Sequence, residues 1–306
     1  MTVPAAGVIP VVPTIFDADE ALDLPGLRRV LDYLVDADSD MVCLLANYSE
    51  QYALSDAERD QVLETAMTHL DGRVPACVTT SHYSSRIAAE RSRRAQDLGA
   101  DMVMLMPPFV GASMRVGADD VVDWFARVAA AIDIPIMVQD APMSPTLLAP
   151  ELLARIAREV PGVQAVKVET ARAAATLRTL GELAPDLPGL FDGEEAITLI
   201  PDLEAGAVGC MSSATLPHEL HGLIADFHAG ERDLAEHTWE RLLPLIHYEN
   251  RQVAQAAVKV LLVEAGVITH DTMRNPGGIV HPDTRRKLVE LAKRRDIFLL
   301  RWGKEN

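Results

Sequence analysis

Lys167 is the residue whose type and setting most directly suggest covalent chemistry. It lies in Val-Gln-Ala-Val-Lys-Val (163–168), an apolar run otherwise suited to burial, and the chain has only five lysines, three of them at or beyond Lys287. Burial disfavours the ammonium and lowers the pKa of a lysine, which leaves free amine to attack a carbonyl. Lys167 is therefore a candidate for Schiff-base formation with a keto compound. The alternative is a structural lysine that reaches solvent or pairs with Glu169.

Polar side chains also follow most of the other short apolar runs, where a barrel would present them at its mouth. Their hydroxyl, amide, imidazole and carboxyl groups could bind a polar substrate or move protons. The candidates that accompany Lys167 are Asn47, Tyr48, Ser49, His82, Tyr83, Gln139, Glu169, Glu194, Glu195, Ser212 and Ser213.

The elements that must position these residues follow from a strict alternation of apolar patterns. Runs of strand length occupy residues 8–13, 41–45, 74–79, 102–106, 134–138, 163–168, 189–191 and 208–212. Between them lie amphipathic stretches at helical spacing, such as 24–35, 56–70, 84–98, 119–132 and 147–158. This order predicts parallel strands joined by crossover helices. Gly99 and Gly206 stand where helix C-caps are expected.

The predicted fold is α/β, a (β/α)8 TIM barrel with a C-terminal helical extension. Residues 1–230 supply the barrel and residues 231–306 an extension packed on it, within a single structural domain; 234–263 and 281–302 are helical by pattern. A doubly wound open sheet is the alternative. No GxGxxG or GxxxxGK[ST] motif occurs, so nucleotide cofactors are not indicated.

Composition restricts the class of partner. The net charge of −17 disfavours nucleic acid and anionic membrane surfaces. Cys43, Cys77 and Cys210 show neither CxxC nor Cys/His spacing, which indicates free thiols in a reducing compartment and no metal site. Residues 1–14 have no basic region and contain three prolines, unlike a signal peptide, and no apolar run reaches membrane-spanning length. The expected location is the cytoplasm.

Four segments resemble the dihydrodipicolinate synthase / N-acetylneuraminate lyase superfamily of Schiff-base aldolases and dehydratases. They are Gly-Val-Ile-Pro-Val-Val-Pro-Thr-Ile-Phe (7–16), Ala-Asn-Tyr-Ser-Glu (46–50), Val-Lys-Val-Glu-Thr (166–170), and Asp-Gly-Glu-Glu-Ala (192–196) followed by Gly-Ala-Val-Gly (206–209). The resemblance spans the chain. It implies that Lys167 is the Schiff-base lysine, that the covalent imine replaces any cofactor, and that the protein is a homo-oligomer, a dimer or a tetramer.

Three positions depart from the superfamily pattern. Gln139 stands where the superfamily has a proton-shuttling tyrosine, Asn47 where it has a threonine, and Phe109 where a neighbouring subunit lends a second tyrosine. An amide has no dissociable proton in the useful range and phenylalanine has no polar group. Ordinary synthase or sialate lyase chemistry is therefore not expected.

The altered segments resemble the bacterial L-2-keto-3-deoxyarabonate dehydratases of pentose oxidation. The matching stretches are 45–52, 78–84, 136–142 and His-Tyr-Glu-Asn-Arg-Gln (247–252). The resemblance implies loss of water from a 2-keto-3-deoxy sugar acid through an imine at C2, giving 2-oxoglutarate semialdehyde. Two alternatives stay open: an aldolase that releases pyruvate and an aldehyde, and a non-catalytic barrel that binds a 2-keto acid.

The chemistry of this reaction suggests roles for the other candidates, stated here as hypotheses. The turn at Tyr48 and Ser49 would hold the substrate carboxylate, and His82 or Tyr83 would replace the missing tyrosine in proton transfer, unless His82 only caps the following helix. Gln139 would orient a substrate oxygen. Glu194 and Glu195 would bind terminal hydroxyls or, equally, occupy the first turn of a helix.

Overall fold

The computed structural model describes residues 6–111 and 116–306, and they form two compact units. Pro75–Met211 form most of one, called here the central unit, and Gly7–Val74 with Ser212–Asn306 form the other, the terminal unit. Strands and helices alternate along the described chain from β1 to α8 and helices alone follow, which is the element order of a (β/α)8 barrel with a helical extension. The predicted boundary at residue 230 does not coincide with this division and stays a prediction.

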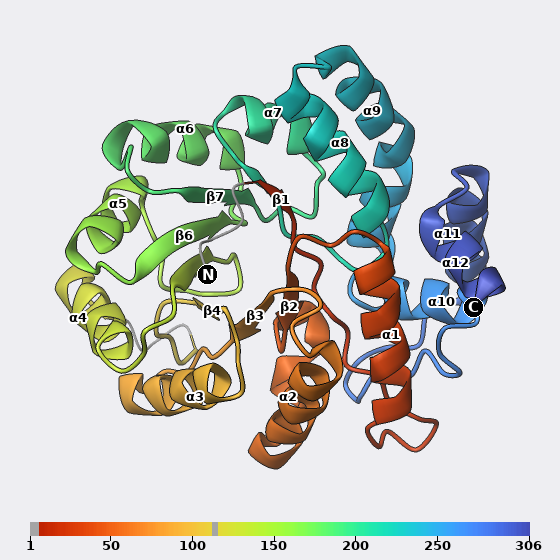
Figure 1. Ribbon diagram of the computed structural model, residues 1–306, viewed down its shortest axis with the longest axis horizontal. Helices are drawn as coiled ribbons and strands as arrows, with labels where there is room; N and C mark the ends of the chain where they lie inside the picture. Colours follow the sequence, from red (N-terminus) through yellow and green to blue (C-terminus); the bar gives the residue numbers. More distant parts are fainter. Residues whose placement is uncertain (1–5, 112–115) are drawn as a thin grey trace. The chain divides into compact units, whose positions relative to one another are not determined.

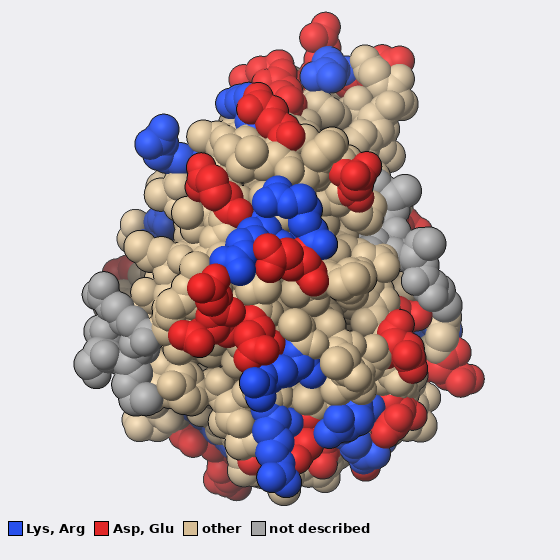
Figure 2. All heavy atoms as spheres, turned by 90° about the vertical axis from the view of Figure 1, so that its left-hand side faces the viewer, with Lys and Arg blue, Asp and Glu red and all other residues tan. Residues whose placement is uncertain are grey.

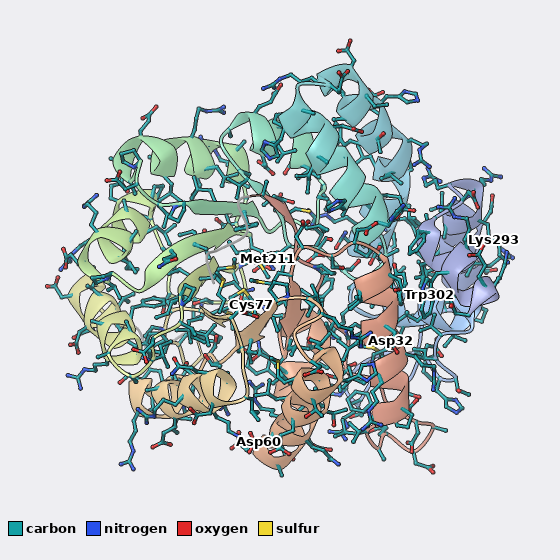
Figure 3. The ribbon with its side chains drawn as sticks, viewed as in Figure 1. Asp32, Asp60, Cys77, Met211, Lys293 and Trp302 are labelled. Atoms are coloured by element: carbon teal, nitrogen blue, oxygen red, sulfur yellow. The ribbon has the colours of Figure 1, made fainter. Side chains whose placement is uncertain are left out.

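The central unit contains a parallel sheet in the order β3-β4-β5-β6-β7-β8. Its strands are β3 (Ala76–Thr79), β4 (Met102–Leu105), β5 (Ile136–Asp140), β6 (Val163–Val168), β7 (Gly189–Asp192) and β8 (Gly209–Cys210). Nearly every residue in them is buried, because a parallel sheet under crossover helices has no solvent-facing side. Cys77 lies on β3 and Met211 directly follows β8 (Figure 3).

Helices cover the outer side of this sheet (Figure 1). They are α3 (Ser85–Asp97), α4 (Ala118–Ala129), α5 (Pro150–Glu159), α6 (Ala173–Leu183) and α7 (Leu199–Glu204). Gly99, with φ +94°, and Gly206, with φ +105°, follow the ends of α3 and α7 in the left-handed conformation that glycine adopts readily, which confirms both predicted C-caps.

The outer face of α4 and α5 carries acidic and basic side chains side by side (Figure 2). Arg155 on α5 pairs with Glu159 at 2.9 Å and with Asp119 on α4 at 2.6 Å. The charges on this face are interspersed, so it presents no extended basic surface for a polyanion.

The terminal unit begins with a shorter strand than the sequence predicts. β1 is only Gly7–Val8, whereas the expected strand ran over residues 8–13. Pro10 and Pro13 lack the N–H group that a ladder needs, and beyond β1 Val11 keeps only isolated parallel bridges, one of them to Cys43 of β2 (Val42–Leu44).

The other elements of this unit are helical. They are α1 (Leu24–Asp36), the 3-10 turns η1 (Asn47–Ser49) and η2 (Gln51–Ala53), α2 (Asp56–Leu70), α8 (Pro217–Ala229), α9 (Arg232–Tyr248), the π-helix η3 (Glu249–Val253), α10 (Ala256–Ala265), α11 (Pro282–Arg294) and α12 (Phe298–Glu305). The predicted helical extension is therefore present, but η3 interrupts the stretch 234–263. In the described residues no helix is both long and apolar enough to cross a membrane.

Side-chain bonds join helices within the terminal unit. Asp32 on α1 (Figure 3) lies 2.8 Å from His69 on α2 and 2.8 Å from Arg73. Trp302 on α12 donates to Asp36 at 2.8 Å, and its ring meets that of Tyr33 edge-on at 5.5 Å. These contacts place α2 and α12 against α1.

Candidate functional site

Lys167 is buried at the end of β6, with 2% of its side chain exposed. Its Nζ lies 2.7 Å from Oε1 of Glu169, two residues on. The parallel register puts Gln139 of β5 on one side of Lys167 and Phe191 of β7 on the other. An amine held in so dry a place needs a partner, and Glu169 supplies it.

Gln139 binds the same carboxylate. Its Nε2 donates to Oε2 of Glu169 at 2.8 Å, so Glu169 joins Lys167 through one oxygen and Gln139 through the other. This bond fixes which way the amide points, and Oε1 of Gln139 is then left buried without a hydrogen-bond partner among the described residues. A buried acceptor without a partner is costly, and a substrate hydroxyl could satisfy it. The orienting role of Gln139 stays a prediction, with this observation in its favour.

Gly193 leaves the space that Lys167 occupies. A Cβ at this position would lie 2.8 Å from Cγ and 2.9 Å from Cε of Lys167, and 2.8 Å from Cγ of Glu169. Such distances are shorter than carbon atoms tolerate. This requirement was not predicted from the sequence, although a glycine directly after the polar end of β7 is a signal that could reveal it.

Two buried carboxyl groups in the central unit hold protons more tightly than usual. Burial, with a contribution from Asp202, raises the pKa of Asp192, and Lys167 acts in the opposite sense. Burial also raises the pKa of Asp202, whose carboxylate accepts from Thr198 at 2.6 Å. Asp192, whose pKa burial raises to about 8, can therefore hold a proton near neutral pH in the unit that carries Lys167. Neither was among the predicted site residues.

Asp140, at the end of β5, is a third such group. Burial raises its pKa, Thr170 opposes this through a 2.6 Å hydrogen bond, and the charge of Glu169 raises it further. Its carbonyl accepts the N–H of Glu169 at 3.0 Å, which ties the ends of β5 and β6 together.

His82 and Tyr83 lie in the loop that follows β3, as predicted. Nδ1 of His82 accepts the N–H of Ser84 at 3.0 Å, so this ring nitrogen carries no proton here. Tyr83 has 37% of its surface exposed, and its carbonyl accepts from Trp124 at 2.9 Å. Ser84 precedes α3, and the N-terminus of α3 has no side-chain capping bond among the described residues, so this contact is not a helix cap. The proton-transfer role of either residue stays a prediction.

Glu194 and Glu195 lie in the turn between β7 and α7. Both oxygens of Asp192 organise this turn by accepting the N–H groups of Glu194, at 2.8 Å, and Ala196, at 2.9 Å. Because α7 begins only at Leu199, the alternative that placed the two glutamates in the first helical turn is wrong. Their predicted contact with substrate hydroxyls is not tested by this geometry.

In the terminal unit, Asn47, Tyr48 and Ser49 form η1. The hydroxyl of Ser49 donates to the carbonyl of Val12 at 2.6 Å and accepts the N–H of Ala46 at 3.0 Å, which braces the turn. Asn47 accepts from Gln51 at 2.7 Å, so its amide holds the turn as well. The Tyr48 hydroxyl donates to Oδ1 of Asn250 at 3.0 Å. Anion binding by this turn stays a prediction.

Ser212 and Ser213 begin the loop that precedes α8, and both are buried. The Ser212 hydroxyl donates to the carbonyl of Ser213 at 3.3 Å, and the Ser213 hydroxyl accepts the N–H of Thr215 at 3.4 Å. The Thr215 hydroxyl in turn donates to the buried carboxyl of Glu249 at 2.9 Å.

Lys259 on α10 is a second buried lysine, with 1% of its side chain exposed. It forms an ion pair with Glu50, the residue after η1, and donates to the carbonyl of Thr272 at 2.8 Å. Burial lowers the pKa of Lys259, and the charge of Glu50 opposes this. Burial alone therefore does not distinguish Lys167 from Lys259; the place of Lys167 at the end of a barrel strand does.

No group of three or more His, Cys, Asp or Glu side chains in the described part of the chain could hold a metal ion.

The strand order and the buried lysine at a strand end define a (β/α)8-barrel protein with a lysine-centred site. A model of the dihydrodipicolinate synthetase family matches residues 4–295, and the chain belongs to this family. It is 48% identical over 298 residues to L-2-keto-3-deoxyarabonate dehydratase of Azospirillum brasilense, which covers 97% of this chain and 96% of the relative. It is 26% identical to 4-hydroxy-tetrahydrodipicolinate synthase of Bacillus subtilis, over 83% of this chain and 87% of the relative.

Solved structures confirm the predicted fold class. YagE, a prophage protein of the dihydrodipicolinic acid synthase family from E. coli K12 in complex with pyruvate, has a TM-score of 0.88 with this chain, with 24% identity, covering 96% of this chain and all of that one. Dihydrodipicolinate synthase from Aquifex aeolicus also gives 0.88, with 20% identity, over 95% and 98% of the two chains.

Proposed function

We propose that this protein is a Schiff-base dehydratase that converts L-2-keto-3-deoxyarabonate to 2-oxoglutarate semialdehyde. The observation that carries the proposal is the buried Lys167 bound to Glu169, in a chain 48% identical to a dehydratase for this substrate. A primary amine in a dry site beside a carboxylate that can take up its proton is equipped to attack a 2-keto group.

The reaction balances as follows. The Lys167 amine adds to C2 and water leaves, giving an imine. The imine acidifies the C3–H bond, a base takes that proton, and the C4 hydroxyl leaves as water with a proton from a general acid. Tautomerisation then moves one hydrogen from C5 and the proton of the C5 hydroxyl to C3 and C4, which leaves an aldehyde at C5. Addition of water to the imine returns the Lys167 amine and releases the product.

Residues of the central unit fit parts of this sequence. Glu169 can accept the proton of the Lys167 ammonium at 2.7 Å, and the partnerless Oε1 of Gln139 can accept a hydrogen bond from a substrate hydroxyl. Burial raises the pKa of Asp192 to about 8, which makes this carboxyl one source of a general acid in the same unit. His82 and Tyr83 remain the proposed alternatives for this role.

Gln139 also favours dehydration over aldol cleavage. Cleavage of the C3–C4 bond needs a base for the C4 hydroxyl, whereas dehydration needs that hydroxyl protonated. The Gln139 amide binds Glu169 and has no proton to exchange in the useful range, so it cannot serve as that base.

The decisive experiment is to incubate the protein with L-2-keto-3-deoxyarabonate and to measure both semialdehyde and pyruvate. The semialdehyde should be the main product. Pyruvate as the main product would instead support an aldolase.

A second measurement tests the covalent step. Borohydride reduction in the presence of pyruvate should add one adduct by intact mass, which disappears in Lys167→Ala and persists in Lys293→Ala, a lysine on α11 with 58% of its side chain exposed (Figure 3). No adduct at saturating pyruvate would favour a 2-keto-acid-binding barrel without catalysis.

We also propose that the enzyme works without a cofactor, in the cytoplasm, as a homo-oligomer. The family resemblance supports the first and the last of these points, and three cysteines without disulfide or metal spacing support the second. Light scattering on the purified protein measures the assembly state, and a monomer at micromolar concentration would contradict that part of the proposal.

A further inference from the structure

Most of the π-helix η3 lies in the family-like segment 247–252, and no residue of this segment takes part in the proposed reaction. A π-helix inserts a residue into the helical repeat, which is rare and occurs often near functional sites. At its end Ala254 adopts φ 57° and ψ −145°, a conformation unfavourable for alanine, and its N–H is bonded to the carbonyl of Glu249 at 2.7 Å. The terminal unit therefore maintains this distortion at a cost.

Glu249 and Asn250, the first two residues of η3, each bind one of the two loops that carry predicted substrate-binding residues. Glu249 is 2% exposed and accepts from the Thr215 hydroxyl at 2.9 Å, which reaches the loop of Ser212 and Ser213. Oδ1 of Asn250 accepts from the Tyr48 hydroxyl at 3.0 Å, which reaches η1.

Two neighbouring residues of η3 form hydrogen bonds to two separate segments, and the distortion of the helix is consistent with this. Nδ2 of Asn250 donates back to the carbonyl of Ile246 at 2.8 Å, so its amide is fixed at both ends and presents its oxygen to Tyr48. Glu249 is buried and Asn250 half-buried, while Arg251 and Gln252 are exposed. Consecutive positions on a regular helix point about 100° apart, and local rewinding is one way to aim both side chains at two segments far apart in the chain.

We propose that Glu249 and Asn250 are positioning residues that set η1 and residues 212–215 in the conformation that binds the substrate. The inference rests on the proposed function for the identity of the substrate. The proposal also predicts that loss of either contact loosens η1 or residues 212–215, and this change can be measured without turnover of the substrate.

The test uses two variants. Asn250→Ala deletes the acceptor of Tyr48 together with the donor to Ile246, and Thr215→Val deletes one of the donors to Glu249 while keeping the shape of the side chain. Asn250→Asp keeps an acceptor oxygen for Tyr48 and is the conservative variant. Glu240→Gln, at an exposed position of α9, is the matched control.

The first readout is amide hydrogen exchange. Exchange should become several-fold faster in η1 for Asn250→Ala and in residues 212–215 for Thr215→Val, while the rest of the unit and the control keep wild-type rates. Asn250→Asp should restore slow exchange in η1. Unchanged exchange in both loops would overturn the inference, whatever the activity.

The second readout separates KM from kcat with L-2-keto-3-deoxyarabonate. KM should rise about tenfold with kcat within about threefold, because the loops contribute to binding in the ground and transition states alike. Asn250→Asp should recover most of the wild-type KM. Faster exchange with an unchanged KM would overturn the positioning role.

The pyruvate concentration that half-saturates the borohydride adduct provides the same comparison without turnover. It should rise in Asn250→Ala and Thr215→Val, and an unchanged value beside faster exchange would count against positioning. If wild-type protein forms the adduct but does not dehydrate the sugar acid, the proposed function fails, and this binding comparison still decides the inference.

Discussion

Replacing Gly193 with alanine should displace the side chain of Lys167 and so lower its reactivity, although Lys167 itself is unchanged. The new Cβ would lie 2.8 Å from Cγ and 2.9 Å from Cε of Lys167. Relaxed carbon contacts are about 3.5 Å or longer, so these atoms must separate by roughly 0.6 to 0.7 Å. Both affected carbons lie in the chain that carries Nζ, so the reactive nitrogen has to move as well.

The expected loss is large for activity and moderate for stability. A misplacement approaching 1 Å costs about 100-fold in rate, so kcat and the rate of adduct formation with pyruvate should both fall by about this factor. Overpacking in a buried site lowers the free energy of unfolding by about 1 to 3 kcal/mol. Timed borohydride quenching followed by intact mass measures the first quantity, and urea unfolding measures the second.

Gly181 supplies a matched control in the same unit. It lies on α6 with no atom within 4 Å of the position that a Cβ would take. Gly181→Ala should therefore keep the wild-type rate of adduct formation. Its free energy of unfolding should rise by about 0.5 to 1 kcal/mol, since alanine is favoured over glycine inside a helix. Wild-type rates in Gly193→Ala would refute the idea that this glycine makes room for Lys167.

Three further predictions concern buried charges and cofactor use. Lys259→Met should lower the free energy of unfolding by about 3 to 5 kcal/mol, because it leaves Glu50 buried without its ammonium partner; a loss below about 1 kcal/mol in urea unfolding would contradict this. Burial raises the pKa of Glu249 from 4.5 to about 7, against the opposing hydrogen bonds of Ser213 and Thr215. Folded protein keeps this proton while unfolded protein loses it, so stability falls as pH rises from about 4.5 to 7, by about 1.4 kcal/mol per pH unit at most. Between pH 5 and pH 7 wild-type stability should fall about 2 kcal/mol more than that of Glu249→Gln, and parallel curves would count against it. Dehydratase activity should survive dialysis against EDTA, and a loss restored by a divalent metal would sink the cofactor-free mechanism.

Local pattern was enough to predict the fold class. Alternating apolar runs and amphipathic stretches predicted eight strands, their helices and a helical C-terminal region, because side-chain periodicity reports directly on which face of an element is buried. The limits of the first strand were less predictable. Residues 8–13 are apolar throughout, but whether the ladder continues past Pro10 depends on which backbone N–H groups a neighbouring strand would use.

Lys167 could be selected from the sequence, and the resemblance supplied its chemistry. Its burial was predictable from the apolar run around it. Lys259 is equally buried, however, and nothing local separates the two lysines. One ends a barrel strand and the other faces Glu50 from a helix, and that difference comes from topology.

The sequence by itself determined the order of elements, the family and the choice of Lys167 as the candidate Schiff-base lysine. Only the tertiary structure decided that Glu169 binds both Lys167 and Gln139, the latter 30 positions before Glu169. It also decided that Gly193 leaves room for Lys167 and that Asn250 binds Tyr48, 202 positions before it. Such contacts depend on strand register and on helix packing, which fix distances of a few ångströms between residues far apart in the chain. Periodicity records which side of an element is buried, but not which side chain it will meet there.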